Sequence, residues 1–299
     1  MNRALVLGAS GFVGRALLAA LGPDAVGTHH ARPWPGSIPF DATRDSLSDV
    51  LDRAGGGIGR LYLLHGAVNP EACARDPVGT AAINVAGVKR LVADAVARGI
   101  LPIFVSSDYV HDGTRGGRTE SEPLTPSTEY GRQKAEVEQW MAGLGAPWLV
   151  ARLSKVVGEA EGVHSVLGQL VPEIRRGATL RMATDQIFSP AHVEDTARAL
   201  AELPPRGARG VVNLAGPVAW SRHDLTACLL AAIRRRDPAI TATLAPCSLR
   251  DIPFREPRPL NTSLDTTKLQ SLLPWRFRPM EEVCERIAEA AFGPARAEA

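Results

Sequence analysis

The chain has 299 residues, of which 45% are hydrophobic and 22% charged, a composition that excludes a disordered or collagen-like protein. Its net charge of +2 creates no attractive field for nucleic acid, and no apolar run approaches the roughly 18 residues that a membrane span needs. The N-terminus leaves no room for a signal peptide and the four cysteines are widely spaced, so we expect a cytoplasmic protein without a metal site.

Strand and helix patterns alternate along the first half of the chain. Short apolar runs predict strands, and the stretches with helical spacing between them predict helices. The expected strands cover residues 4–7, 25–28, 38–40, 61–64, 101–105 and 148–153, and the expected helices cover residues 12–21, 81–97 and 129–141. This alternation predicts an α/β fold, a Rossmann-type doubly wound parallel sheet with helices on both faces.

After residue 154 the alternation loosens into short helices and proline-rich connections. Residues 193–203 and 211–214 look like a return to the sheet. We therefore expect residues 1–154, with return segments near 190–215, to form a dinucleotide-binding domain. Residues 155–299 would form mostly a smaller C-terminal substrate lobe. The cleft between two such lobes is the natural ligand site.

A glycine-rich loop follows the first expected strand, with Gly8, Gly11 and Gly14 three residues apart. Gly8 permits the tight turn, Gly11 lets the backbone approach a pyrophosphate, and Gly14 lets the helix pack on the strand. The exposed N–H groups at the start of the helix then hold the anion. This loop predicts a dinucleotide cofactor.

The residues after the second strand bear on which cofactor binds. A carboxylate there favours NAD, whereas a basic residue accommodates the additional phosphate of NADP. This sequence has Thr28, His29, His30 and Arg32, with no carboxylate before Asp41. The pattern favours NADP(H) over NAD(H), and Asp41 is a candidate for contacting the adenine.

Tyr130 and Lys134 lie four residues apart, so both project from one face of the expected helix 129–141. Ser107 follows the strand 101–105, at the edge where parallel sheets bind ligands. A hydroxyl there is suited to polarise a substrate carbonyl, and a phenol to protonate the oxygen after hydride attack. We expect the Lys134 ammonium to lower the pKa of Tyr130 for this role.

Asn84 is a polar residue inside the otherwise apolar helix 81–97. If it is buried, its amide must be hydrogen-bonded. Two interpretations stay open: the amide holds a water near Lys134, which we favour, or it binds neighbouring backbone.

These motifs resemble the extended short-chain dehydrogenase/reductases, and more narrowly the dTDP-4-dehydrorhamnose reductase group of sugar-nucleotide reductases. The last of the matching motifs is the most specific to this branch. In family order, and across nearly the whole chain, they are Gly8-x-x-Gly11-x-x-Gly14, Ser106-Ser107-Asp108-Tyr109-Val110-x-Asp112-Gly113, Pro126-x-x-x-Tyr130-Gly131-x-x-Lys134, Pro190-x-His192-Val193-Glu194-Asp195 and Arg258-Pro259-x-Asn261-Thr262-Ser263-Leu264-Asp265-x-x-Lys268-Leu269.

The resemblance implies a role for each part of these motifs. Ser107, Tyr130 and Lys134 would be the catalytic set, with Lys134 also holding the nicotinamide ribose. The pyrophosphate of the cofactor would lie against Gly8, Ser10, Gly11, Phe12 and Val13, and its adenosine against His65, Gly66 and Ala67. The sugar of the substrate would be bordered by Asp108 and Tyr109, and its nucleotide by Arg258, Pro259, Leu260 and Asn261.

Three parts of the chain depart from the family pattern. Lys155 stands where the family often has an aromatic residue that packs on the deoxysugar, so it is a candidate for binding a phosphate or carboxylate of the substrate. A solvated lysine at the end of a strand is an equally good interpretation. His111 replaces a usual phenylalanine, and the region around His65 diverges from the usual Asn-Ala-Ala-Ala.

The leading hypothesis is an NADPH-dependent reductase of the C4 ketone of a nucleotide-linked 4-keto-6-deoxy sugar, with the proton supplied by Tyr130. The alternative is a non-catalytic NADP-binding regulatory subunit. The stretch Ser106-Ser107-Asp108-Tyr109-Val110 and the motif Arg258-Pro259-x-Asn261 also resemble the beta subunit of methionine adenosyltransferase. A dehydratase is disfavoured, because no acidic pair follows Ser107. An epimerase of the same superfamily would keep its cofactor tightly bound, so release of free cofactor on dialysis would argue against it. The expected helices 81–97 and 129–141 offer a candidate homodimer face.

Overall fold

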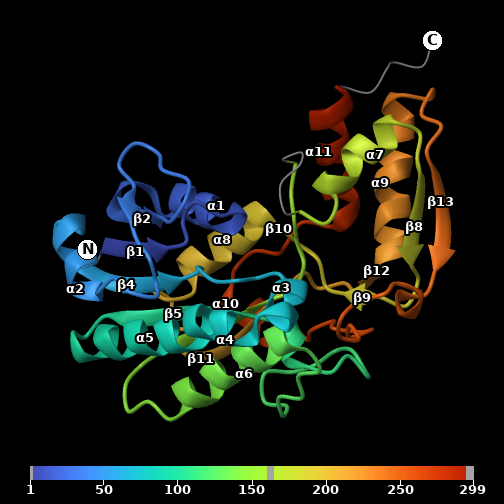
Figure 1. Ribbon diagram of the computed structural model, residues 1–299. Coiled ribbons are helices and arrows are strands. Elements are labelled where there is room, and N and C mark those ends of the chain that lie inside the picture. The colour runs from blue at the N-terminus through green and yellow to red at the C-terminus, as the bar shows by residue number, and fades with distance from the viewer. Residues whose placement is uncertain (1–2, 160–164, 294–299) are drawn as a thin grey trace.

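The computed structural model describes residues 3–159 and 165–293, and a seven-stranded parallel sheet forms its centre (Figure 1). The strand order is β11-β6-β5-β4-β1-β2-β3, so the order reverses between β1 and β4. This reversal is the mark of a doubly wound sheet, and the predicted Rossmann-type fold is confirmed. The strands are β1 (Arg3–Leu7), β2 (Ala25–His29), β3 (Ile38–Pro39), β4 (Ile58–Leu63), β5 (Leu101–Ser107), β6 (Leu149–Leu153) and β11 (Gly210–Leu214).

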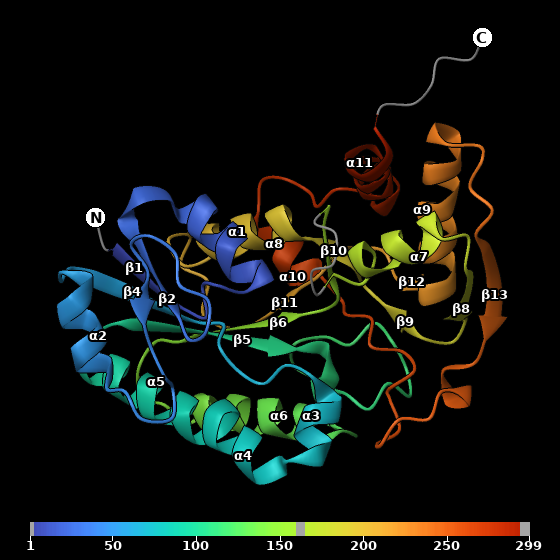
Figure 2. The same ribbon diagram turned by 45° about the horizontal axis from the view of Figure 1, so that its top comes forward.

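Helices cover both faces of this sheet, as Figure 2 shows. One face carries α1 (Phe12–Leu21), α8 (Val193–Glu202) and α10 (Thr267–Leu272), and the other carries α2 (Leu47–Ala54), α5 (Val88–Ala97) and α6 (Glu129–Ala142). Successive residues of β1 therefore pack into different cores: Ala4 and Val6 belong to the first, Leu5 and Leu7 to the second. A strand buried on both faces reads as a continuous apolar run, which is why it was visible in the sequence.

The helix expected over residues 81–97 is interrupted. Two short helices, α3 (Pro70–Arg75) and α4 (Pro77–Ala81), precede a π-helical segment at Ala82–Gly87, and α5 follows it. Such segments recur at functional sites, and this one carries Asn84. Helices α5 and α6 lie side by side on the sheet (Figure 1), and the homodimer face on them stays a prediction.

The C-terminal lobe is smaller and has its own core. A parallel pair, β8 (Thr179–Ala183) and β13 (Thr243–Cys247), packs with α7 (Val171–Arg175), α9 (Arg222–Arg236) and α11 (Met280–Phe292). Two short pairs join it to the sheet domain: β7 (Val156–Val157) with β10 (Ala191–His192), and β9 (Ile187–Phe188) with β12 (Trp220–Ser221). Short 3₁₀ turns lie at Gly22–Asp24, Asp108–Val110, Gly168–Leu170 and Leu249–Asp251.

The chain returns to the sheet domain twice. Helix α8 and strand β11 form the return expected near residues 190–215. A second return places Leu269, Leu273 and Phe277 in the core beside α8. We had expected these residues in the C-terminal lobe. In residues 3–159 and 165–293, no helix has both the length and the apolar character to cross a bilayer.

Candidate active site

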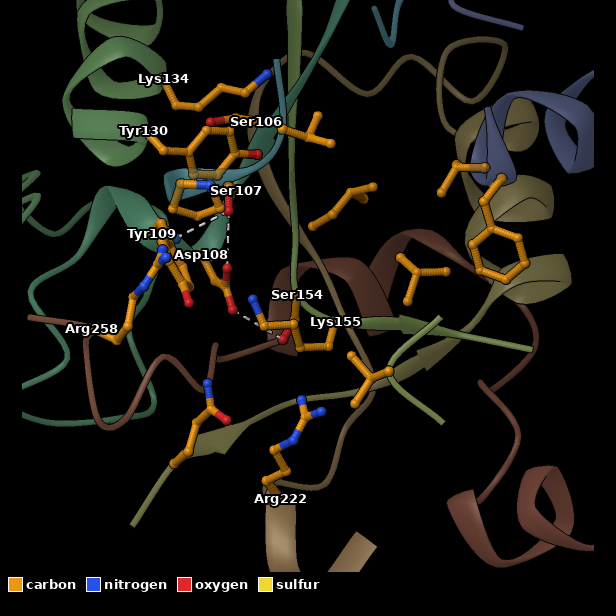
Figure 3. A pocket seen from close by; sticks show the side chains of 18 of the residues that line it. Ser106, Ser107, Asp108, Tyr109, Tyr130, Lys134, Ser154, Lys155, Arg222 and Arg258 are labelled. Carbon is orange, nitrogen blue, oxygen red and sulfur yellow. Dashed lines mark hydrogen bonds between the residues drawn. The ribbon is translucent and has the colours of Figure 1, made fainter. Parts of the chain in front are cut away.

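A cleft of about 690 Å³ lies at the carboxyl ends of the sheet strands, where the C-terminal lobe faces them (Figure 3). The sheet domain contributes the glycine loop, the end of β5 and one face of α6 to its lining. The other lobe contributes residues of β8, the start of α9 and the segment 249–258. A second cleft of about 450 Å³ shares Gly8 and Gly11 with the first and continues toward the end of β2.

The loop between β1 and α1 has the form that a pyrophosphate needs. Gly8 has φ +81°, and a Cβ on it would come within 2.6 Å of the His65 backbone nitrogen. A Cβ on Gly14 would lie 2.5 Å from the Gly8 carbonyl oxygen, so packing requires both glycines. Gly11 differs, because its backbone is extended (φ −76°) and a Cβ there meets, among the described residues, a single atom at 3.3 Å. Gly11 leaves open the space at the N-terminus of α1, where an anion is favoured.

The second cleft gathers the residues expected at the adenosine end of the cofactor. Its lining includes Ser10, Thr28, His29, His30, Arg32, Asp41, His65, Gly66 and Ala67. The His30 imidazole lies 3.8 Å from the Asp41 carboxylate, and Thr43 donates to the same carboxylate at 2.6 Å. Hydrogen bonds from the Thr43 hydroxyl and the Thr43 N–H hold the pKa of Asp41 below its usual value. Phe12 and Val13 line the larger cleft instead.

His65 and Asn84 have different surroundings in this region. Both ring nitrogens of His65 are buried without a hydrogen-bond partner among the described residues, and burial lowers its pKa to about 3. The Asn84 amide binds backbone: Oδ1 accepts from the Ala67 N–H at 2.8 Å, and Nδ2 donates to the Ala67 carbonyl at 2.9 Å and to Gln133 at 2.8 Å. Our favoured expectation of a water near Lys134 is therefore replaced by the second interpretation. Asn84 holds the backbone at Ala67 from behind and is not a lining residue of either cleft.

Ser107, Tyr130 and Lys134 converge on the larger cleft (Figure 3). Ser107 ends β5, where its Oγ accepts from the Tyr109 N–H at 3.2 Å and donates to Asp108 at 3.0 Å. Tyr130 and Lys134 lie on the first turns of α6, a helix whose N-terminus is capped by the Thr128 hydroxyl. The fold thus brings together three residues that the sequence places on two separate elements.

The two titratable members have opposite pKa shifts with the same cause. Burial lowers the pKa of Lys134 to about 8, and its Nζ donates to the Val105 carbonyl at 2.9 Å. Burial raises the pKa of Tyr130, and the Ser107 hydroxyl offsets only part of that rise. The Lys134 Nζ lies 5.9 Å from the Tyr130 ring centroid, but burial dominates, so the net shift of the Tyr130 pKa is upward and not the lowering that we expected. The phenol keeps its proton at neutral pH, which is the form that a proton donor needs.

A buried ion pair supports this site from behind. Glu138 on α6 and Arg152 on β6 are each 2% exposed and lie 2.8 Å apart, and Ser106 donates to Glu138 at 2.5 Å. Our sequence reasoning missed this pair, although an arginine inside an apolar strand was a signal for it. His111, the departure from the family pattern, is also buried, and burial lowers its pKa to about 4.

The expected substrate residues are divided between the cleft and its supports. Asp108, Tyr109, Lys155 and Arg258 line the cleft, with Asp108 accepting from Thr262 at 2.7 Å. The Arg258 guanidinium pairs with Glu71 at 2.5 Å and stacks on Phe254 at 4.8 Å. Asn261 is not among the lining residues and instead binds Ser263 within its own turn. Two cleft residues, Arg181 and Arg222, were not predicted, because no local motif marks them.

Comparisons with known proteins agree with this geometry. A family model described as "RmlD substrate binding domain" matches residues 1–291. The beta subunit of methionine adenosyltransferase 2 from Rattus norvegicus is 26% identical and aligns with 91% of this chain and 82% of that protein.

Two solved structures share the fold closely. The dTDP-4-dehydrorhamnose reductase from Bacillus anthracis in complex with NADP has a TM-score of 0.77 and 20% identity, over 96% of this chain and 98% of that chain. MoeE5 in complex with UDP-glucuronic acid and NAD has a TM-score of 0.81 and 23% identity, over 96% of this chain and 98% of that chain. Since the family model spans almost the whole chain, this protein belongs to the RmlD substrate binding domain family of extended short-chain dehydrogenase/reductases and is an NAD(P)-dependent oxidoreductase.

Proposed function

We propose that the protein reduces the C4 ketone of a nucleotide-linked sugar to an alcohol, with NADPH as the reductant and a 4-keto-6-deoxy sugar as the expected substrate. The observation that carries the proposal is the convergence of Ser107, Tyr130 and Lys134 beside the open space at Gly11. The dTDP-4-dehydrorhamnose reductase with the same fold was solved with NADP.

Bound NADPH supplies a hydride to the carbonyl carbon. The residues of the chain act on the oxygen of that carbonyl. The Ser107 hydroxyl turns its one proton from Asp108 to this oxygen and stabilises the negative charge that develops during hydride attack. Tyr130 then transfers its phenolic proton to the oxygen, which completes the alcohol. Lys134, held at the end of β5 by the Val105 carbonyl, places a positive charge next to the phenolate that remains.

The preference for NADPH rests on the residues at the end of β2. Arg32 and His30 are exposed beside the second cleft, and His29 is half-buried there. Asp41, whose carboxylate lines this cleft, is already bound by Thr43 and lies against His30. A guanidinium in this position favours an additional phosphate on the ribose.

The test is the oxidation of NADPH by the purified protein with dTDP-4-dehydrorhamnose, run in parallel with NADH. We expect turnover that falls by about 10²-fold or more in Tyr130→Phe, while the affinity for NADPH stays within about 2-fold. Turnover that survives the substitution would contradict the role of Tyr130. An equal rate with NADH would contradict the NADPH preference alone.

A second role has one observation in its favour, the similarity to a methionine adenosyltransferase beta subunit. If this chain serves as a partner subunit, it should co-purify with a methionine adenosyltransferase and alter its kinetics. That result, together with no NADPH oxidation by any sugar nucleotide, would favour the partner role over the reductase.

A further inference from the structure

An ion pair links the segment 249–258 to helix α3. Arg258 in this segment donates from Nη2 to Glu71 Oε1 on α3 at 2.5 Å. The other oxygen of the same carboxylate accepts from the Arg255 N–H at 3.4 Å. The side chain of Arg258 is 7% exposed and that of Glu71 is 33% exposed. Since the arginine side chain is nearly buried, this charge-assisted contact is stronger than a fully exposed pair and holds the guanidinium in one place.

The pair places this guanidinium at the junction of two cavities. Arg258 lines the larger cleft (Figure 3) and also a neighbouring cavity of about 560 Å³. The Phe254 ring lies 4.8 Å from the guanidinium and limits its rotation. In the part of the chain that the structure describes, Glu71 is the one acceptor bound to it. A guanidinium has five N–H donors, so others stay available for phosphate oxygens.

Glu71 belongs to the segment that lines the expected cofactor site. Residues 66–68 line the second cleft, and Asn69 follows them directly. The Asn69 side chain caps α3 by accepting from the Glu71 N–H at 2.8 Å. Asn84 holds the N–H and the carbonyl of Ala67, which fixes the start of the same segment. A ligand that contacts residues 66–68 therefore acts on the position of Glu71.

One side chain of this segment is poised to be covered by a ligand. Val68 is 59% exposed, and it lines both clefts. An apolar side chain gains free energy when a ligand removes it from water. We expect a dinucleotide along both clefts to cover Val68, and so to favour the arrangement of the segment that permits this contact. Glu71 and Arg258 are then ordered before the substrate arrives, and its binding costs less conformational entropy.

We infer that the pair Glu71–Arg258 couples the two ligands of the proposed function. With the cofactor bound, Arg258 is fixed toward the diphosphate of the nucleotide sugar, which then binds more tightly than to the free protein. Glu71 is a positioning residue, because it acts through Arg258. The inference rests on the proposed function and adds the dependence of one ligand on the other. Such coupling is reciprocal, so the nucleotide strengthens cofactor binding by the same factor.

The test measures by calorimetry the affinity of dTDP and of UDP for two forms of the protein. One form is free, and the other is saturated with NADP⁺ or NAD⁺, whichever binds more tightly. These probes carry the diphosphate without a sugar, so a contact between nicotinamide and sugar cannot produce the effect. We expect the cofactor to strengthen the binding of the better probe by about 5-fold or more. In Glu71→Gln the factor should fall to about 2-fold or less, with the affinity for the cofactor alone within about 2-fold of the wild type.

The control is Glu136→Gln, which removes an exposed carboxylate of α6 that pairs with Lys89 and should keep the full factor. Equal probe affinities of the wild type with and without cofactor would overturn the inference, and so would a factor that survives in Glu71→Gln. Tighter probe binding in Glu71→Gln would also overturn it, because Glu71 would then compete with phosphate for Arg258. If neither probe binds either form, the proposed nucleotide-sugar substrate fails too, whereas Tyr130-dependent reduction without coupling overturns only the inference.

Discussion

The two walls of the cleft are built in different ways. The wall at which we propose the cofactor, the cofactor wall, consists of the glycine loop, the end of β2 and the segment that follows β4. The substrate wall is assembled from segments that begin near residues 155, 181, 222 and 249, and it presents charged side chains. We therefore expect the first wall to bind the cofactor through features common to this fold, and the second to decide which sugar binds.

The largest effect should come from the glycine loop, where two substitutions separate packing from ligand space. Gly14→Ala places a Cβ 2.5 Å from the Gly8 oxygen, so we expect loss of NADPH binding by about 100-fold or more and a destabilised fold. Gly11→Ala should leave stability nearly unchanged and weaken NADPH binding by about 10-fold, because its Cβ has room until the pyrophosphate arrives. Fluorescence titration measures the NADPH affinity of each variant, and thermal unfolding measures its stability. Wild-type affinity in Gly11→Ala would contradict the assignment of this space to the cofactor.

The ion pair behind the site should contribute more to stability than any surface pair. Arg152→Met leaves the Glu138 carboxylate buried and unpaired, which should cost about 3–5 kcal/mol in the free energy of unfolding. The control is Arg98→Met, whose partner Asp94 and own side chain are each 39% exposed, with an expected cost under about 1 kcal/mol. Urea unfolding distinguishes them. Equal costs would mean that the buried pair gives no specific support.

Acid should weaken the junction between the sheet domain and α11. The His192 hydrogen bond lowers the pKa of Glu159 to about 2, and Arg286 also pairs with this carboxylate. Because the pKa is lower in the folded than in the unfolded chain, this stabilisation is present above about pH 4.5 and is lost as the pH falls toward 2. Urea unfolding at pH 5 and pH 3 should therefore differ less in Glu159→Gln than in the wild type. An unchanged pH dependence would contradict this contribution.

The smallest effect should come from the contact that joins the two walls. Glu256 accepts from the Glu129 N–H at 2.9 Å, at the N-terminus of the helix that carries Tyr130, and pairs with Arg132 at 2.6 Å. Glu256→Ala should cost about 1 kcal/mol of stability, as the loss of other helix caps does. We also expect a lower kcat at unchanged NADPH affinity. A kcat equal to that of the wild type would show that the cap does not position the helix.

Much of the cofactor wall was predictable from sequence, because its requirements are local. A strand, three glycines at fixed spacing and a helix specify the loop. A spacing of four residues on one helix places Tyr130 and Lys134 on the same helix face. For Asn84 we favoured the less accurate of two interpretations, because the backbone of Ala67 that it binds comes from another segment of the chain, which periodicity does not reveal.

The substrate wall was less predictable, because its members are close only in the folded chain. Arg222 comes to the cleft through the pairing of β12 with β9, which periodicity does not reveal. Glu138 and Arg152 meet across the α6–β6 contact in the same way. The second return of the chain around Phe277 was missed because short helices after prolines have no strong pattern.

The most direct test of the reductase assignment follows the hydrogen itself. The protein is incubated with dTDP-4-dehydrorhamnose and NADPH carrying deuterium at the transferable C4 position of the nicotinamide. Mass spectrometry and NMR of the product should find one deuterium, bonded to C4 of the sugar, and Tyr130→Phe should abolish its appearance. NADPH consumption without deuterium at C4 of the sugar, or no NADPH consumption, would contradict the assignment.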